Sequence, residues 1–176
     1  MKNTLKNKQS TICTTLKNFK KYLHLANKSG IKTPLNYSDI SVNSCKGNRT
    51  FLTHLEINSI YDFRSRLYTS EAHKDIIDRF LFACFTGLRI SDIQKISEEN
   101  IIENHLVFTA EKTGKFQRIL LNKTAQKFIN KSGPLFRGNY TPEHINRELK
   151  FIAKACNVKK HLTFHVSRHS FATNYL

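Results

Sequence analysis

Cationic side chains at three places in the sequence are suited to binding one phosphate group together. The first is Arg89, which comes two residues after Gly87, where a nearly all-apolar stretch ends. An arginine at the edge of a core can present its planar guanidinium to two phosphate oxygens at once. Asp92, three residues further on, can orient that guanidinium. The alternative is an ordinary salt bridge at the start of a helix.

The second place is the segment Glu111–Lys115, which lies between two expected strands. A β-turn there would carry Lys112 or Lys115 on a flexible stem. A lysine in such a position can protonate a leaving oxygen if its pKa is lowered by neighbouring cations. The alternative is a solvated hairpin tip, whose lysines only discourage other strands from pairing with the sheet edge.

The third place is a helix expected from residue 163 onward. His165 and Arg168 are three residues apart on it, so both side chains point at the same spot. His161, His165 and His169 also recur every four residues, a spacing that could suggest a metal site. No cysteine or carboxylate completes a tetrahedral set with them, so we expect no metal.

Helices and one β-hairpin are expected to position these side chains. The capping box Thr53–Glu56 begins one helix, and Thr113–Gly114 forms the hairpin turn. The order of elements predicts an α+β chain that is mostly α-helical, with a small antiparallel hairpin. Helices are expected over residues 10–29, after 53, 71–85, from 91, 122–130, from 141 and from 163 through 176; strands are expected over 101–109 and 116–121.

The charge of the chain indicates a polyanionic partner. There are 29 Lys and Arg residues against 13 Asp and Glu, a formal net charge of +16, and residues 1–50 contain ten of the bases with one acid, Asp39. Nucleic acid is the commonest such partner, although lysines can also simply cover a solvated face. The candidates for contacts with a DNA backbone are Lys17, Lys20, Lys21, Lys46, Arg49 and Lys115.

The sequence contains no apolar stretch near the roughly 20 residues that cross a bilayer, and no signal peptide is visible. The chain has four cysteines, and none is in a C-x-x-C motif, which argues against a zinc ribbon or a redox pair. Scattered thiols suit a reducing compartment, so we expect a cytoplasmic protein without membrane contact.

In their order and spacing, the three segments resemble the tyrosine recombinase family, which includes phage integrases, integrases of mobile elements and Xer-type resolvases. The family pattern T-G-L-R-x-x-E/D corresponds to Thr86–Asp92, the hairpin lysine to Lys112, and H-x-x-R-H-x-F-A-T to His165–Thr173. The resemblance implies a catalytic domain over residues 46–176. It also implies that residues 1–45 contain the last helix of a core-binding domain and a linker.

The resemblance implies metal-free DNA cleavage and rejoining through a 3′-phosphotyrosine, without a cofactor. In that chemistry the arginines would neutralise charge that develops on the phosphate oxygens, and the histidine would donate a further hydrogen bond. The lysine would protonate the departing 5′-oxygen. The residues assigned to catalysis are Arg89, Lys112, His165 and Arg168, and those assigned to their support are Asp92 and His169.

The family's nucleophilic tyrosine follows the F-A-T segment at a distance, so we expect no nucleophile within this chain. Tyr175 is expected to pack on the core instead. The chain would then be a fragment, inactive alone, of an enzyme that acts on double-stranded DNA as a tetramer. Two alternatives are a catalytically inactive remnant that still binds double-stranded DNA, and a basic RNA-binding protein.

Overall fold

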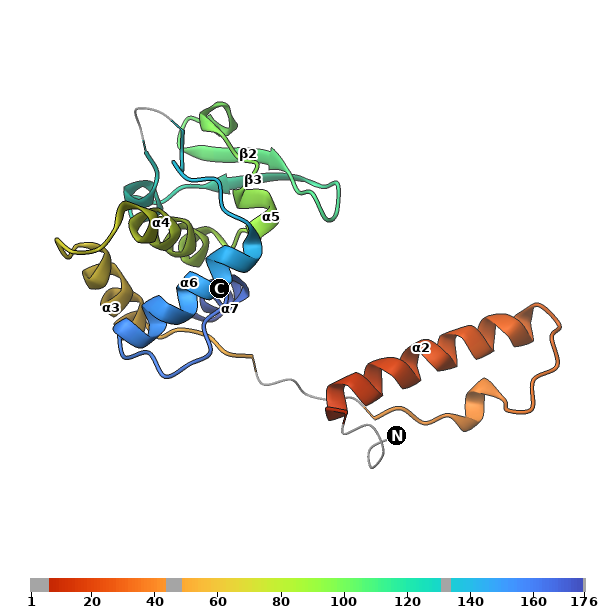
Figure 1. Ribbon diagram of the computed structural model, residues 1–176. Coiled ribbons are helices and arrows are strands. Elements are labelled where there is room, and N and C mark those ends of the chain that lie inside the picture. Colours follow the sequence, from red (N-terminus) through yellow and green to blue (C-terminus); the bar gives the residue numbers. More distant parts are fainter. Residues whose placement is uncertain (1–6, 44–48, 131–133, 176) are drawn as a thin grey trace. The chain divides into compact units, whose positions relative to one another are not determined.

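The chain forms two compact units, Met1–Asn48 and Arg49–Leu176. The structure, a computed structural model, describes residues 7–43, 49–130 and 134–175 (Figure 1). None of the helices within these ranges is both long enough and apolar enough to cross a bilayer.

The first unit contains one long helix, α2 (Gln9–Lys28), and a short 3-10 turn, η1 (Tyr37–Asp39). The helix confirms the one expected over residues 10–29, but it begins one residue before Ser10, at a position with no side-chain cap. Lys20 Nζ donates a hydrogen bond to Ile40 O at 2.9 Å, which holds the returning segment against the helix. Cys13 is disulfide-bonded, so the expectation of scattered thiols is wrong at that position.

Helix α4 (Glu71–Thr86) lies at the centre of the second unit (Figure 1). Residues on nearly all sides of it are fully buried, including Ile76, Phe80 and Cys84, which confirms it as a core helix. Around it lie α3 (His54–Arg64), α5 (Ile90–Ile93), α6 (Pro142–Ala155) and α7 (Phe164–Asn174). The mostly helical α+β class is thereby confirmed.

Local sequence signals explain where the surrounding helices begin. Thr53 Oγ1 accepts from Glu56 N–H at 3.3 Å, and Glu56 Oε2 accepts from Thr53 N–H at 2.8 Å, which confirms the capping box. Pro142 occupies the first turn of α6, and Thr141 caps that helix through the N–H of His144 at 3.2 Å. These caps fix the starting points of α3 and α6.

The sheet differs from the expected hairpin in one respect. It has three antiparallel strands, β1 (Ile101–Ile102), β2 (His105–Thr109) and β3 (Phe116–Leu120), in that order. The single strand expected over 101–109 is wrong, because Glu103 and Asn104 have φ values of 47° and 65° and form a tight turn. Asparagine tolerates this left-handed conformation better than most residues, but the sequence contains no glycine there that would predict the turn.

Two expected helices are also shorter than the pattern suggests. Asn122 Oδ1 caps the N–H of Ala125 at 2.8 Å, yet only a 3-10 turn, η3 (Ala125–Phe128), follows it. Helix α7 ends at Asn174, and Tyr175 has left the helix with φ −132°, so the expected continuation through residue 176 is wrong.

Helix α7 is fixed in place by residues far away in the sequence. Its N-terminus has no cap of its own, and Asn146 Oδ1 of α6 accepts from the N–H of Phe164 at 2.7 Å instead. Near its other end, Ser170 Oγ accepts from Leu52 N–H at 2.8 Å, and Asn174 Nδ2 donates to Leu52 O at 3.0 Å. The orientation of the side chains on α7 therefore depends on α6 and on the first residues of the second unit.

Candidate functional site

Arg89 lies where the central helix ends. Gly87 terminates α4 in the left-handed conformation, with φ 70°, and Arg89 is the N-cap of α5. Asp92 is buried, and its Oδ2 lies 3.7 Å from Arg89 Nη1, while a third of the Arg89 side chain stays exposed (34%). The buried carboxylate therefore orients a guanidinium whose other face is open to a ligand.

Asp92 also fixes the hairpin that contains Lys112. Its second oxygen, Oδ1, accepts a hydrogen bond from Glu111 N–H at 3.0 Å. The backbone next to Lys112 is thus held by the same carboxylate that orients Arg89. The Lys112 side chain is exposed, and its ammonium forms no hydrogen bond or ion pair with any residue that the structure describes. The hairpin is fixed while its lysine is left free to move.

Arg168 reaches the same place from α7. Its Nη1 donates a hydrogen bond to the carbonyl oxygen of Gly87. Burial lowers the pKa of Arg168, and the nearby positive charge of Arg89 lowers it further, while Asp92 opposes that shift. The two arginines predicted from separate motifs therefore lie close enough to repel each other, with one shared counter-charge.

His165 and His169 complete the cationic group. Their rings meet edge to face, with centroids 4.6 Å apart. Burial lowers the pKa of His165, and the positive charges of His169, Arg168, Arg49 and Arg89 act in the same direction. His165 is therefore held neutral more strongly than an isolated histidine, so it can donate a hydrogen bond from one ring nitrogen without a full charge.

We expect the pKa of His165 to lie below the ordinary value of 6.5 in the free protein and to rise when a phosphate binds. Since the folded state disfavours the proton, this histidine lowers stability as pH falls through about 6.5, where the unfolded chain takes up the proton first. NMR titration of the ring protons, with and without duplex DNA, measures both values. In a His169→Gln variant the pKa should move back toward 6.5, and an unchanged value would contradict the electrostatic cause.

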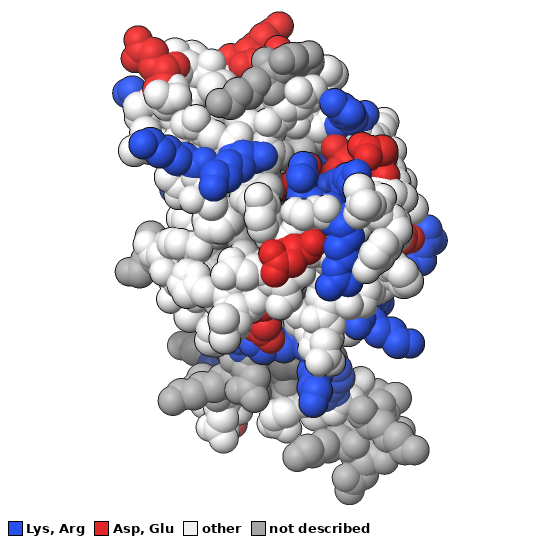
Figure 2. All heavy atoms as spheres, turned by 90° about the vertical axis from the view of Figure 1, so that its left-hand side faces the viewer, with Lys and Arg blue, Asp and Glu red and all other residues white. Residues whose placement is uncertain are grey.

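The candidates for DNA-backbone contacts are divided between the two units. Arg49 and Lys115 are exposed in the second unit, and Arg49 also acts electrostatically on His165. In the first unit Lys17 and Lys21 are exposed, whereas Lys20 is engaged with Ile40 O. Lys46 lies outside the described residues. Basic and acidic side chains are interspersed over the face shown in Figure 2, so the net charge does not form a uniform shell.

Tyr175 lies against aromatic rings beside α7. Its ring centroid is 5.4 Å from that of Phe85, 6.1 Å from Phe171 and 5.7 Å from His54. Burial raises the pKa of its hydroxyl, and Cys84 adds to the shift. A tyrosine that must be deprotonated to attack gains nothing from this environment.

Several residues that position the site were not predicted from the sequence. Gly87 was expected only to end a helix, but its carbonyl also receives the Arg168 guanidinium. Asn146 and Ser170 hold the two ends of α7 through contacts with distant backbone groups. Among the residues described, no three His, Cys, Asp or Glu side chains come together as possible metal ligands.

Comparisons with known proteins give a consistent result. A family model described as the phage integrase family matches residues 50–176. No curated protein matches the chain by sequence. Among solved structures, lambda integrase bound to DNA is similar with a TM-score of 0.73 at 16% identity, over 97% of this chain and 66% of that one.

Two further structures show the same fold. A lambda integrase tetramer bound to a Holliday junction has a TM-score of 0.68 at 17% identity, over 91% of this chain and 50% of that one. The Tn1549 transposon integrase in complex with circular intermediate DNA has a TM-score of 0.62 at 18% identity, over 92% and 66% of the two chains. The chain thus spans between half and two thirds of the length of these proteins.

Proposed function

The chain belongs to the phage integrase family, and from this premise we propose that it serves site-specific DNA recombination by tyrosine recombinase chemistry. The DNA strand would be cleaved and rejoined through a 3′-phosphotyrosine, with no metal or cofactor. The single observation that carries the proposal is the meeting of Arg89 and Arg168 at the end of α4, around the buried carboxylate of Asp92.

The geometry supports a distinct role for each proposed catalytic residue. Arg89 and Arg168 would hold the non-bridging oxygens of the scissile phosphate and stabilise the charge that develops on them. His165, whose pKa is lowered by burial and by neighbouring positive charges, would donate one more hydrogen bond, with His169 supporting its ring. Lys112 would reach in from the anchored hairpin and protonate the departing 5′-oxygen.

Double-stranded DNA is the proposed partner, and the active form is a tetramer on that DNA. The lambda integrase tetramer on a Holliday junction supports this assembly by structural analogy. Met1–Asn48 would supply the last helix of a core-binding domain, in which Lys17 and Lys21 contact phosphates. We propose that the protein acts in the cytoplasm. By analogy with the Tn1549 transposon integrase, we also propose that a mobile element encodes it.

The nucleophilic tyrosine is proposed to lie outside this chain. Tyr175 is the tyrosine nearest in sequence to Arg168, and its hydroxyl has a raised pKa within an aromatic cluster. In this proposal the chain supplies the residues that bind the phosphate, and Tyr175 is not the attacking group.

Duplex binding tests this function. Arg89→Ala and Arg168→Ala should each weaken binding to a nicked suicide duplex by roughly ten- to a hundredfold at low salt, because each removes a charge-assisted contact worth about 1.5–3 kcal/mol. Fluorescence anisotropy measures the affinities. Arg118→Ala is the matched control, since this exposed arginine lies on β3, and it should change binding less than threefold, a difference of roughly 0.7 kcal/mol at most.

The same duplex tests the position of the nucleophile. Denaturing gels should show no covalent protein–DNA adduct from this chain alone. An adduct that disappears in Tyr175→Phe would overturn that part of the proposal. Equal affinity of the parent protein at low and high salt would count against DNA binding altogether, and a preference for RNA duplexes would favour the RNA-binding alternative.

A further inference from the structure

Three lysines surround the end of α6, and none has an acidic partner among the residues that the structure describes. Lys150 and Lys154 lie one helical turn apart on its exposed side, and Lys159 follows on the loop that leads to α7. We call these three residues the α6 lysine cluster. They line a hollow of about 490 Å³, and no Asp or Glu side chain is among the residues that line it.

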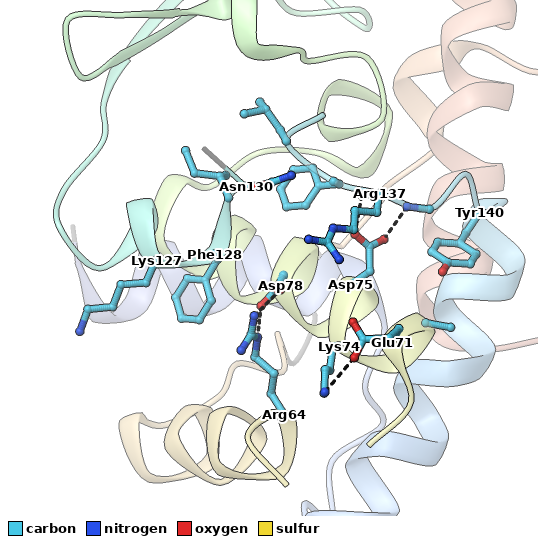
Figure 3. A pocket seen from close by; sticks show the side chains of 15 residues that line it. Arg64, Glu71, Lys74, Asp75, Asp78, Lys127, Phe128, Asn130, Arg137 and Tyr140 are labelled. Atoms are coloured by element: carbon cyan, nitrogen blue, oxygen red, sulfur yellow. Dashed lines mark hydrogen bonds and ion pairs between the residues drawn. The ribbon is translucent and has the colours of Figure 1, made fainter. Parts of the chain in front are cut away.

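A second hollow of similar size differs in that it is lined by carboxylates as well as cations. It holds about 470 Å³ beside α4, and two of the cations that line it are paired with carboxylates (Figure 3). There Arg64 pairs with Asp78, and Lys74 pairs with Glu71 at 2.9 Å. Those charges neutralise one another within the protein, whereas the α6 lysine cluster has no such internal compensation.

The ammonium groups of the cluster are free to bind a ligand. Across the described ranges, none of the three forms a hydrogen bond or an ion pair. Their neighbour Lys160 is already engaged: its Nζ donates to Glu56 Oε2 at 2.6 Å and to Phe51 O at 2.9 Å. Glu56 therefore pairs with Lys160, and among the described residues no carboxylate pairs with the α6 lysine cluster.

Stabilisation of the helix explains only part of this arrangement. A lysine in the last turn of a helix interacts favourably with the free carbonyl groups there, and Lys154 is in that position. Lys150 lies a turn earlier and Lys159 lies beyond the end of the helix, where this effect fades. The helix-end effect therefore does not account for the positions of Lys150 and Lys159.

We propose that the α6 lysine cluster binds the sugar-phosphate backbone of duplex DNA beside the cleavage site. This inference rests on the proposed function, because the scissile phosphate is taken to lie at Arg89 and His165. Lys159 and His165 are six positions apart in the sequence, so their Cα atoms are at most about 20 Å apart. At about 3.4 Å per base pair, Lys159 would meet phosphates within roughly six base pairs of the scissile one.

The salt dependence of binding tests the cluster directly. In a triple variant, Lys150→Gln with Lys154→Gln and Lys159→Gln, the slope of log K against log salt should become shallower by about 2.7, since each phosphate contact contributes about 0.9. Between 50 and 200 mM salt, the parent protein should lose about fortyfold more affinity than the variant. Anisotropy with a fluorescent 30-base-pair duplex gives both slopes, and circular dichroism checks that the variant is folded.

The matched control removes the same charge elsewhere. The triple variant Lys74→Gln, Lys123→Gln and Lys127→Gln alters exposed or paired lysines near α4 and η3, and it should shift the slope by less than about one contact. Equal shifts in both variants would show that net charge alone matters, and would overturn the proposal. So would a change seen only with an RNA duplex. If the parent binds DNA and the cluster variant keeps its slope, only this inference fails; if the parent does not bind, the proposed function fails with it.

Discussion

Replacing Gly87 with alanine should lower the free energy of unfolding by about 2–4 kcal/mol. The residue has φ 70°, a conformation that costs an L-residue with a side chain about 1–2 kcal/mol. An added Cβ would also lie only 2.6 Å from Cδ1 of Phe171, so the ring must move. Because Phe171 belongs to the same helix as Arg168, and Arg168 donates to Gly87 O, the change should also weaken DNA binding.

Gly114→Ala separates the two causes. Gly114 has a similar φ of 62° in the hairpin turn, but no atom lies within 4 Å of an added Cβ. Its replacement should cost only the backbone term of about 1–2 kcal/mol and leave affinity for DNA nearly unchanged. Urea denaturation gives both stabilities. If Gly87→Ala and Gly114→Ala cost the same, contact with Phe171 contributes nothing, and the tight packing of α7 against the end of α4 is not what fixes Arg168.

Asp92→Ala should destabilise the second unit by about 2–4 kcal/mol and weaken duplex binding by about tenfold or more. The buried carboxylate accepts from Glu111 N–H at 3.0 Å and lies 3.7 Å from the Arg89 guanidinium. Alanine leaves the amide without its acceptor and the arginine without its orienting charge. Both the hairpin and the phosphate-binding arginine should then become mobile.

Asp92→Asn distinguishes the two contacts, since an amide oxygen can still accept from Glu111 N–H but carries no charge. It should retain most of the stability, losing about 1 kcal/mol, while binding still falls because Arg89 is no longer held by a carboxylate. If the asparagine variant binds DNA like the parent, Asp92 acts only through the hairpin. The two substitutions, measured by urea denaturation and anisotropy, thus assign stability and phosphate binding to separate oxygens of one side chain.

Elements with local signals were predicted well from the sequence. Short sequence signals predicted three helices: the capping box for α3, the apolar run for α4 and Pro142 for the start of α6. The wrong predictions concern elements whose conformation depends on only a few residues. The turn at Glu103 and Asn104 depends on two unusual φ values, and the short turn η3 has a cap without the tertiary packing that would extend it into a helix.

The residues of the candidate site were proposed from three motifs and their order, but the sequence does not predict the contacts that position them. Arg89 and Arg168 lie 79 positions apart in the sequence, and no local pattern states that Arg168 will donate to Gly87 O. Likewise, nothing in the sequence around Asn146 indicates that its side chain accepts a hydrogen bond from Phe164 N–H, the first amide of α7. Side chains that bond to distant backbone groups leave no periodicity in a sequence.

The bonds between Leu52 and α7 have a consequence for synthesis. Leu52 is among the first residues of the second unit to leave the ribosome, and its partners Ser170 and Asn174 come 118 and 122 residues later. Closing a loop of that length is entropically costly and slows folding. At a translation rate of about 5–20 residues per second, α4 would wait several seconds or more for the helix that covers it. A nascent chain therefore exposes the apolar end of α4 during that interval, and chaperones have that long to bind it.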